Sequence, residues 1–77
     1  MDLRQTFATN LRRLRNDASL SQEELALRAD VNRTYVSKLE TGAAYVGLEI
    51  LGKLAAVLQV EPAEMLRPPA RGQRRKR

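Results

Sequence analysis

Four polar side chains between positions 33 and 38 have the types and the spacing needed to bind the edges of nucleic-acid bases. In a helix, positions i, i+1, i+4 and i+5 share one face, and here they carry Arg33, Thr34, Ser37 and Lys38. Arginine and lysine can donate to O6 and N7 of guanine, and a threonine methyl can contact the methyl of thymine. The opposite face carries Val36 and Leu39, which predicts that this helix packs on a core.

This helix is expected over about residues 32–41, after a shorter helix over about 21–28. Ser21 predicts the N-cap of the shorter helix, and Glu24 three residues later completes a capping box. Between the helices, Asp30 tolerates left-handed backbone geometry better than most residues, and Gly42 fits the end of the second helix. Two short helices joined by such a turn indicate a helix-turn-helix, whose second helix enters the major groove of DNA.

The rest of the chain predicts a small all-α scaffold for this pair. An N-terminal helix over about residues 3–17 has one apolar face, formed by Leu3, Phe7, Leu11 and Leu14. A helix from about residue 47 is expected to bury Leu51, Leu54, Ala55 and Leu58. Pro62 suits the first turn of a short fifth helix. The expected fold is a compact five-helix domain over residues 1–66.

The composition excludes several classes of chemistry. Among 77 residues there is no cysteine and no histidine, which excludes a disulfide framework, a Cys/His zinc site and histidine acid–base catalysis. No pairing of a base with a nucleophile and no cluster of metal ligands is visible, so we expect neither an enzyme nor a bound cofactor. No small-molecule ligand is indicated. No apolar run approaches the roughly 20 residues of a membrane span, which favours a soluble, cytoplasmic protein.

The positive charge is concentrated at the C-terminal end of the chain. The net charge is +5, and six of the fourteen Lys and Arg residues lie in 67–77, leaving eight against all nine acidic residues in 1–66. We expect residues 67–77 to be a disordered basic tail. The tail can either raise DNA affinity at low salt without selecting sequence, or serve as an idle solubilising end.

Four segments resemble the lambda-repressor-like (Cro/CI-type, Xre) family of DNA-binding domains. They are LRRLR at 11–15, LSQEELA at 20–26, YVSKLETG at 35–42 and LGKLAAVLQV at 51–60. The resemblance covers about residues 5–66 and implies a recognition helix over 32–41 that contacts bases through Arg33, Thr34, Ser37 and Lys38. It also implies a bacterial or phage-encoded protein.

The resemblance further implies contacts with the DNA backbone. Gln22 stands where family members bind a phosphate at the start of the second helix. Asn32 is expected to cap the recognition helix and also to contact a phosphate. Tyr35 is expected mainly to pack, with its hydroxyl near the backbone, and can also contact a phosphate. The loop over residues 43–46 lacks the basic residues common in the family. Ala43 and its neighbours are therefore expected to contact a phosphate only through backbone N–H groups.

A partly buried ion pair between Arg15 and Glu40 is also implied, tying the first helix to the recognition helix. Family members usually dimerise, and Val60, Met65 and Leu66 are expected either to form the dimer surface or to belong to the monomer core.

The expected function is transcriptional regulation, by a repressor that binds a palindromic operator in double-stranded DNA as a homodimer. A phage-type repressor, a restriction–modification controller and an antitoxin with a toxin partner all fit. The alternative is a protein-interaction or coactivator module that uses the same fold without reading bases.

Overall fold

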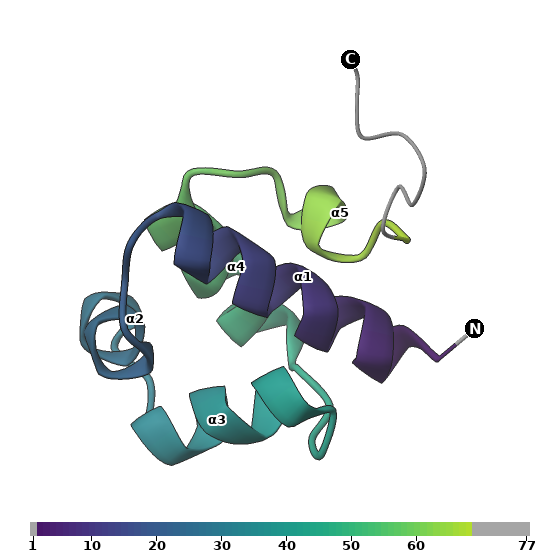
Figure 1. Cartoon of the computed structure of the whole chain (residues 1–77), viewed down its shortest axis with the longest axis horizontal. Coiled ribbons are helices and arrows are strands. Elements are labelled where there is room, and N and C mark those ends of the chain that lie inside the picture. The colour runs from purple at the N-terminus through teal and green to yellow at the C-terminus, as the bar shows by residue number, and fades with distance from the viewer. Residues whose placement is uncertain (1, 69–77) are drawn as a thin grey trace.

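Five helices make up the fold in the computed structural model, which describes residues 2–68 (Figure 1). They are α1 (Leu3–Asp17), α2 (Gln22–Ala29), α3 (Arg33–Thr41), α4 (Leu48–Leu58) and α5 (Pro62–Met65). No strand occurs in this part of the chain, so the predicted all-α, five-helix class is confirmed. None of the helices within residues 2–68 has the length and apolarity to cross a membrane. Positions 69–77, most of the predicted basic tail, lie outside the described residues.

Short local hydrogen bonds set the ends of α2 and α3. The Ser21 hydroxyl accepts from the Glu24 N–H at 3.0 Å, and the Glu24 carboxylate accepts from the Ser21 N–H at 2.8 Å, which confirms the capping box. Asp30 has a φ of 58°, the left-handed geometry expected of this turn. Asn32 Oδ1 then accepts from the Thr34 N–H at 2.7 Å and starts α3. The turn thereby fixes the direction in which α3 leaves α2.

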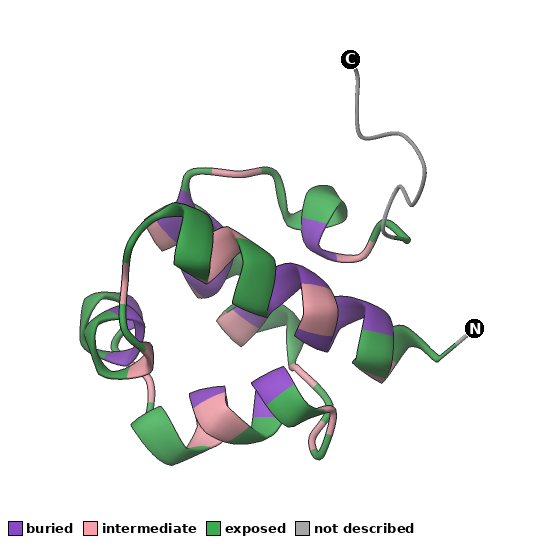
Figure 2. Cartoon of the chain, in the orientation of Figure 1, coloured by how far each residue is buried: buried purple, intermediate pink, exposed green. Residues whose placement is uncertain are grey.

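All five helices contribute side chains to one apolar core. In Figure 2 the buried stretches of α1, α3 and α4 face the interior of the domain. Six core side chains larger than alanine have no exposed surface: Leu11, Leu25, Val36, Leu39, Leu54 and Met65. Burying a side chain of this size contributes about 1.5–3 kcal/mol. The inner face of α3 is therefore held by apolar packing, as predicted.

One part of the apolar face predicted for α1 lies outside this core. Phe7 and Leu11 are buried and Leu14 is partly buried against the core, but Leu3 is 58% exposed. Leu3 is in the first turn of α1, beyond the part of the helix that the core covers. Leu3 does lie on the predicted face of α1, but the core does not extend as far as the first turn of this helix.

A buried amide, Asn10, attaches α5 to α1. Its side chain is 1% exposed, and Nδ2 lies 2.8 Å from the carbonyl oxygens of Met65 and Arg67 and 3.4 Å from that of Glu64. A single-turn helix such as α5 has few internal hydrogen bonds, so its last carbonyls need partners from elsewhere. Asn10 supplies them and holds the end of the domain in place.

Candidate nucleic-acid interface

The outer face of α3 presents the polar side chains predicted to contact bases. Arg33, Thr34 and Lys38 are exposed and Ser37 is half-buried. Within residues 2–68, none of these four side chains forms a hydrogen bond or an ion pair with another side chain or with the backbone. Because the opposite face of α3 is buried, the donors on the outer face have a fixed platform and are available to a partner.

A polar cluster of Arg15, Gln22 and Glu40, called here the Glu40 cluster, holds α3 from behind. Arg15 donates to both carboxylate oxygens of Glu40, from Nε at 2.6 Å and from Nη2 at 3.0 Å. The Arg15 side chain is 15% exposed and that of Glu40 is 3% exposed. The ion pair expected from the resemblance is therefore present, with the two-point geometry that makes such pairs directional.

Two further bonds extend from α1 around the Glu40 cluster. The Arg12 guanidinium donates to the backbone carbonyl of Glu40 near the end of α3. Arg15 Nη1 donates to the carbonyl of Leu20 at 2.8 Å, in the loop before α2. In the sequence, Arg12 follows Leu11 of the apolar face of α1 and lies on the opposite, polar side of this helix. Its place one turn before Arg15 is the only signal that it could reach the same acceptor region.

The electrostatics of the Glu40 cluster favour a charged Arg15. The side-chain hydrogen bond to Glu40 raises the pKa of Arg15 above its ordinary value, burial works against this, and the charge of Glu40 adds to the increase. Arginine is already fully protonated in proteins. Arg15 therefore stays charged throughout the physiological range of pH and is a permanent hydrogen-bond donor from α1 to Glu40 of α3.

Gln22 joins the Glu40 cluster to the surface expected to meet phosphate. It is the first residue of α2, and its Nε2 donates to Glu40 Oε1 at 3.0 Å. A primary amide has two N–H donors, so this bond leaves a second donor for an external acceptor. The side chain is half-buried. The bond to Glu40 therefore restricts the Gln22 amide to the start of α2, where backbone N–H groups also favour an anion.

The structure corrects the expectation for Ala43. Its N–H donates to the carbonyl of Lys38 at 2.9 Å, and the N–H of Gly42 donates to that of Leu39 at 3.3 Å. These bonds close the end of α3 around Gly42, whose φ is 79°. The Ala43 N–H is thus already used, so it is not a free donor for phosphate.

Tyr35 has the packing role expected for it. The side chain is half-buried, and its hydroxyl donates to the carbonyl of Tyr45 at 2.7 Å. This bond links α3 to the loop before α4 and limits the motion of that loop. A contact between Tyr35 and phosphate stays a prediction, as does the second role proposed for Asn32.

One of the three residues expected at a dimer surface is inside the monomer. Met65 is 0% exposed and belongs to the core, so its assignment to a dimer surface is wrong. It is buried because Asn10 holds the backbone of α5 against α1. Val60 and Leu66 are half-buried and pack against the core, with part of each side chain left at the surface.

The fold and this exposed helix face define a helix-turn-helix domain of the lambda-repressor-like type. Residues 11–65 match the family model described as helix-turn-helix. This match spans more than half of the 77 residues, and the chain belongs to that family.

Relatives include control proteins and transcription factors. The chain is 35% identical over 66 residues to control protein C.BamHI of Bacillus amyloliquefaciens, covering 84% of this chain and 82% of that protein. The crystal structure of the hypothetical transcription factor NHTF from Neisseria superposes with a TM-score of 0.85 at 41% identity, covering 88% of this chain and 76% of that one. The restriction-modification controller protein C.AhdI from Aeromonas hydrophila gives a TM-score of 0.78 at 40% identity, covering 80% and 94%.

Proposed function

We propose that this protein is a transcriptional regulator that binds double-stranded DNA sequence-specifically as a homodimer and inserts α3 into the major groove. The observation that carries the proposal is the outer face of α3. There Arg33, Thr34 and Lys38 are exposed and unbonded within the described chain, on a helix whose inner face is fixed. Each good base contact contributes about 1–3 kcal/mol of discrimination between bases.

Phosphate contacts by Gln22 and Asn32 would set the position of α3 on the duplex. Gln22 has one amide donor engaged by Glu40 and a second one left. Asn32 is exposed at the start of α3, where its carbonyl oxygen caps the helix. Contacts of this kind fix register and orientation without selecting sequence. Selection of sequence then depends on the side chains of the outer face.

The dimensions of the domain support binding as a dimer. Two recognition helices on a palindromic operator lie about 34 Å apart, one turn of DNA. The domain measures 35 × 25 × 18 Å along its principal axes. Two copies placed side by side on one face of the duplex can therefore touch each other while each α3 occupies its own half-site.

Repression by promoter occupancy is the proposed mode of action, because it requires only binding at a promoter. Among regulators of this fold, control of a restriction–modification system is the context that the relatives favour. C.BamHI is named a control protein and C.AhdI a restriction-modification controller. Both are similar to this chain over most of their own length, with shares of 82% and 94%.

Selection from a random double-stranded DNA library at near-physiological salt tests the proposal. The wild type is compared with Arg33→Ala/Lys38→Ala. A control, Arg13→Ala/Lys53→Ala, removes the same two charges from α1 and α4. We expect wild type and control to select one inverted repeat that the α3 variant does not select. If no sequence is selected and binding disappears as salt rises, the association is non-specific, and the protein-interaction alternative becomes the better account.

A further inference from the structure

Arg12 reaches the C-terminal end of α3 with most of its hydrogen-bonding capacity unused. Its guanidinium donates to the backbone carbonyl of Glu40, and a guanidinium has five N–H donors. Within residues 2–68 the side chain forms no second hydrogen bond and no ion pair, and the residue is exposed. The bond to Glu40 therefore fixes the guanidinium in place while its other donors stay available to a partner.

The charges around Arg12 leave a positive excess at this place. The Glu40 carboxylate is already bonded at two points by Arg15, and the Glu40 carbonyl accepts from Arg12. Two arginines thus meet one glutamate, which gives the group a net charge of +1. The carbonyls at the C-terminus of a helix ordinarily repel an anion. Here an approaching anion would meet N–H donors instead.

Gln22 bonds to the same glutamate as Arg12. Gln22 Nε2 donates to Glu40 Oε1 at 3.0 Å, whereas Arg12 donates to the backbone carbonyl of that residue. The two side chains are therefore separated by no more than one glutamate residue and two hydrogen bonds. A single strand of DNA that passes the start of α2 can be reached by both.

The loop after α3 offers little to the DNA backbone. Positions 43–46 contain no lysine or arginine, and the N–H of Ala43 is bonded to the carbonyl of Lys38. The side of α1 that faces the end of α3 is polar instead. Gln5, seven positions before Arg12 and on the same face of the helix, lies against Gly42. Near the end of α3, charged donors are thus offered by α1 and not by the loop.

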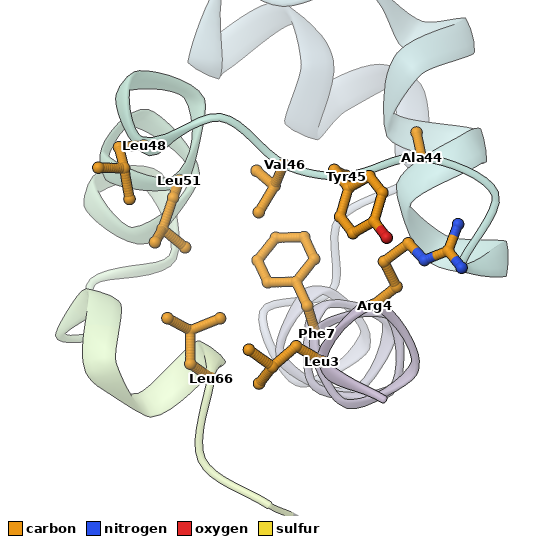
Figure 3. Close-up of a pocket in the computed structure, with 9 residues that line it drawn as sticks. All are labelled: Leu3, Arg4, Phe7, Ala44, Tyr45, Val46, Leu48, Leu51 and Leu66. Carbon is orange, nitrogen blue, oxygen red and sulfur yellow. The ribbon is translucent and has the colours of Figure 1, made fainter. Parts of the chain in front are cut away.

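Arg4, another cation of α1, is engaged elsewhere. An apolar groove lies where α1, the loop before α4 and α4 meet (Figure 3). Its lining includes Leu3, Arg4, Phe7, Tyr45 and Leu48. The Arg4 guanidinium carbon lies 4.5 Å from the centroid of the Tyr45 ring, and Arg4 Nε lies 3.9 Å from a carboxylate oxygen of Asp2. A cation–π contact and an acidic neighbour reduce the attraction of Arg4 for an anion. Arg12 has neither within residues 2–68.

We propose that Arg12 binds a phosphate of the DNA backbone beside Gln22, an inference that rests on the proposed DNA-binding function. The guanidinium supplies from α1 the positive charge that the loop over residues 43–46 lacks. The contact raises affinity and fixes the position of α3 without selecting a base, because phosphate contacts carry no sequence information. Glu40 gains a further role, since its carbonyl positions Arg12 and its carboxylate positions Gln22.

The salt dependence of DNA binding tests the inference, with Arg12→Gln, Arg12→Lys and the matched control Arg13→Gln. The control removes the same charge one residue along α1, where Arg13 Nη1 lies 4.0 Å from a carboxylate oxygen of Asp17. Each protein is titrated with a duplex that carries the selected repeat. Arg12→Gln should reduce the slope of log K against log salt concentration by about 0.9 for each bound copy. It should also weaken binding about tenfold per copy. Arg12→Lys, which keeps the charge, and Arg13→Gln should keep the slope of the wild type.

A purely structural role for Arg12 predicts a different result. Loss of the bond to the Glu40 carbonyl would then lower the Tm of Arg12→Gln and leave the salt slope unchanged. The titrations are therefore made well below the Tm of each variant, measured by circular dichroism. An Arg12→Gln slope equal to that of the wild type would overturn the inference, and so would an equal reduction of the slope in Arg13→Gln.

Neutral methylphosphonates in the selected repeat locate the contact. Replacing one phosphate at a time should weaken binding of the wild type at the phosphate that Arg12 contacts, and this loss should disappear in Arg12→Gln. Gln22→Ala should remove the loss at the same phosphate or at an adjacent one. Losses that stay unchanged in Arg12→Gln at every position would overturn the inference.

The inference and the proposed function fail in different ways. If the wild type selects a repeat and Arg12→Gln keeps the slope of the wild type, only the inference fails. If no sequence is selected but Arg12→Gln reduces the slope on a random duplex, the phosphate contact stands and sequence-specific regulation fails. A wild type that binds no duplex overturns both.

Discussion

The two ends of α1 contact the rest of the domain through different chemistry. Toward its C-terminal end, Arg12 and Arg15 hydrogen-bond to Glu40, with Arg15 held at two points. At its N-terminal end, Leu3 and Phe7 line the apolar groove. Hydrogen bonds depend on direction, whereas apolar contact depends on area. The directional bonds at the polar end therefore fix the orientation of α3, whereas the apolar end of α1 offers contact area without a fixed direction.

Among the variants proposed here, the one that removes the Glu40 carboxylate should lower the stability of the protein most. Glu40→Ala leaves Arg15 largely buried without its partner, which costs about 3–5 kcal/mol. In a domain of this size the Tm should fall by more than about 10 °C. Thermal unfolding followed by circular dichroism measures the change, with exposed Glu23→Ala as the control. The folded fraction should keep the base preference of the wild type. An unchanged Tm would show that the ion pair adds nothing to stability.

In the middle of α1, the uncharged amide of Asn10 attaches another helix, α5, through hydrogen bonds alone. Asn10→Ala removes the donor shared by the carbonyls of Glu64, Met65 and Arg67. Leaving such acceptors without a partner costs about 1–3 kcal/mol. Hydrogen exchange should show faster exchange of the Leu66 amide, which bonds within α5, while α3 stays protected. Asn16→Ala on the exposed side of α1 is the control. Equal loss of protection in α3 and α5 would mean that the two attachments are not independent.

Gly42 stands between the two regions, at the end of α3 and before the loop that lines the groove. Its φ is 79°, and an added Cβ would collide with the Gln5 side chain. Gly42→Ala should therefore cost about 1–2 kcal/mol from the backbone alone. Gln5→Ala should relieve the collision and leave the backbone cost. Gly52→Ala in α4, where nothing lies within 4 Å of the new Cβ, should instead stabilise by about 0.5–1 kcal/mol. Urea unfolding measures the free energy of unfolding of each variant. If Gly42→Ala and Gly52→Ala changed this free energy in the same direction, the prediction would be contradicted.

The smallest expected effect is a pH dependence of the capping box formed by Ser21 and Glu24 at the start of α2. The backbone N–H of Ser21, and then its hydroxyl, lower the pKa of Glu24 from its ordinary value of 4.5. A carboxylate with a lowered pKa in the folded state stabilises the protein above pH 4.5, and this contribution is lost as the pH falls through the lower folded value. The stability difference between wild type and Glu24→Gln should thus shrink between pH 5 and pH 3. Urea unfolding measures the difference, and Glu23→Gln, the control, should show no such trend. A stability difference between wild type and Glu24→Gln that grows as the pH falls would contradict the prediction.

Local features of the fold could be predicted from the sequence because their causes lie within a few residues. The capping box at Ser21 and Glu24, the left-handed Asp30 and the cap at Asn32 all depend on neighbours two or three positions away. The extent of the core could not be predicted in this way. Helical periodicity placed Leu3 on the apolar face, but it does not say where the neighbouring helices stop covering that face.

Contacts between distant residues were found only where a family resemblance supplied them. Arg15 and Glu40 are 25 positions apart, and their pairing came from the resemblance. The partners of Asn10 lie 54 to 57 positions away, and no periodicity or composition indicates them. The occupied N–H of Ala43 and the buried Met65 depend in the same way on bonds and packing that only the structure shows.

The separation of the two faces of α3 has a consequence for protein engineering. The side chains that hold the helix, Val36, Leu39 and Glu40, point inward and are buried. Arg33, Thr34, Ser37 and Lys38 make no side-chain bonds within residues 2–68, so replacing them should change stability by no more than about 0.5 kcal/mol. A library randomised at these four codons should therefore consist mostly of folded proteins. Directed evolution could then search for new operators without having to restore the scaffold at each step.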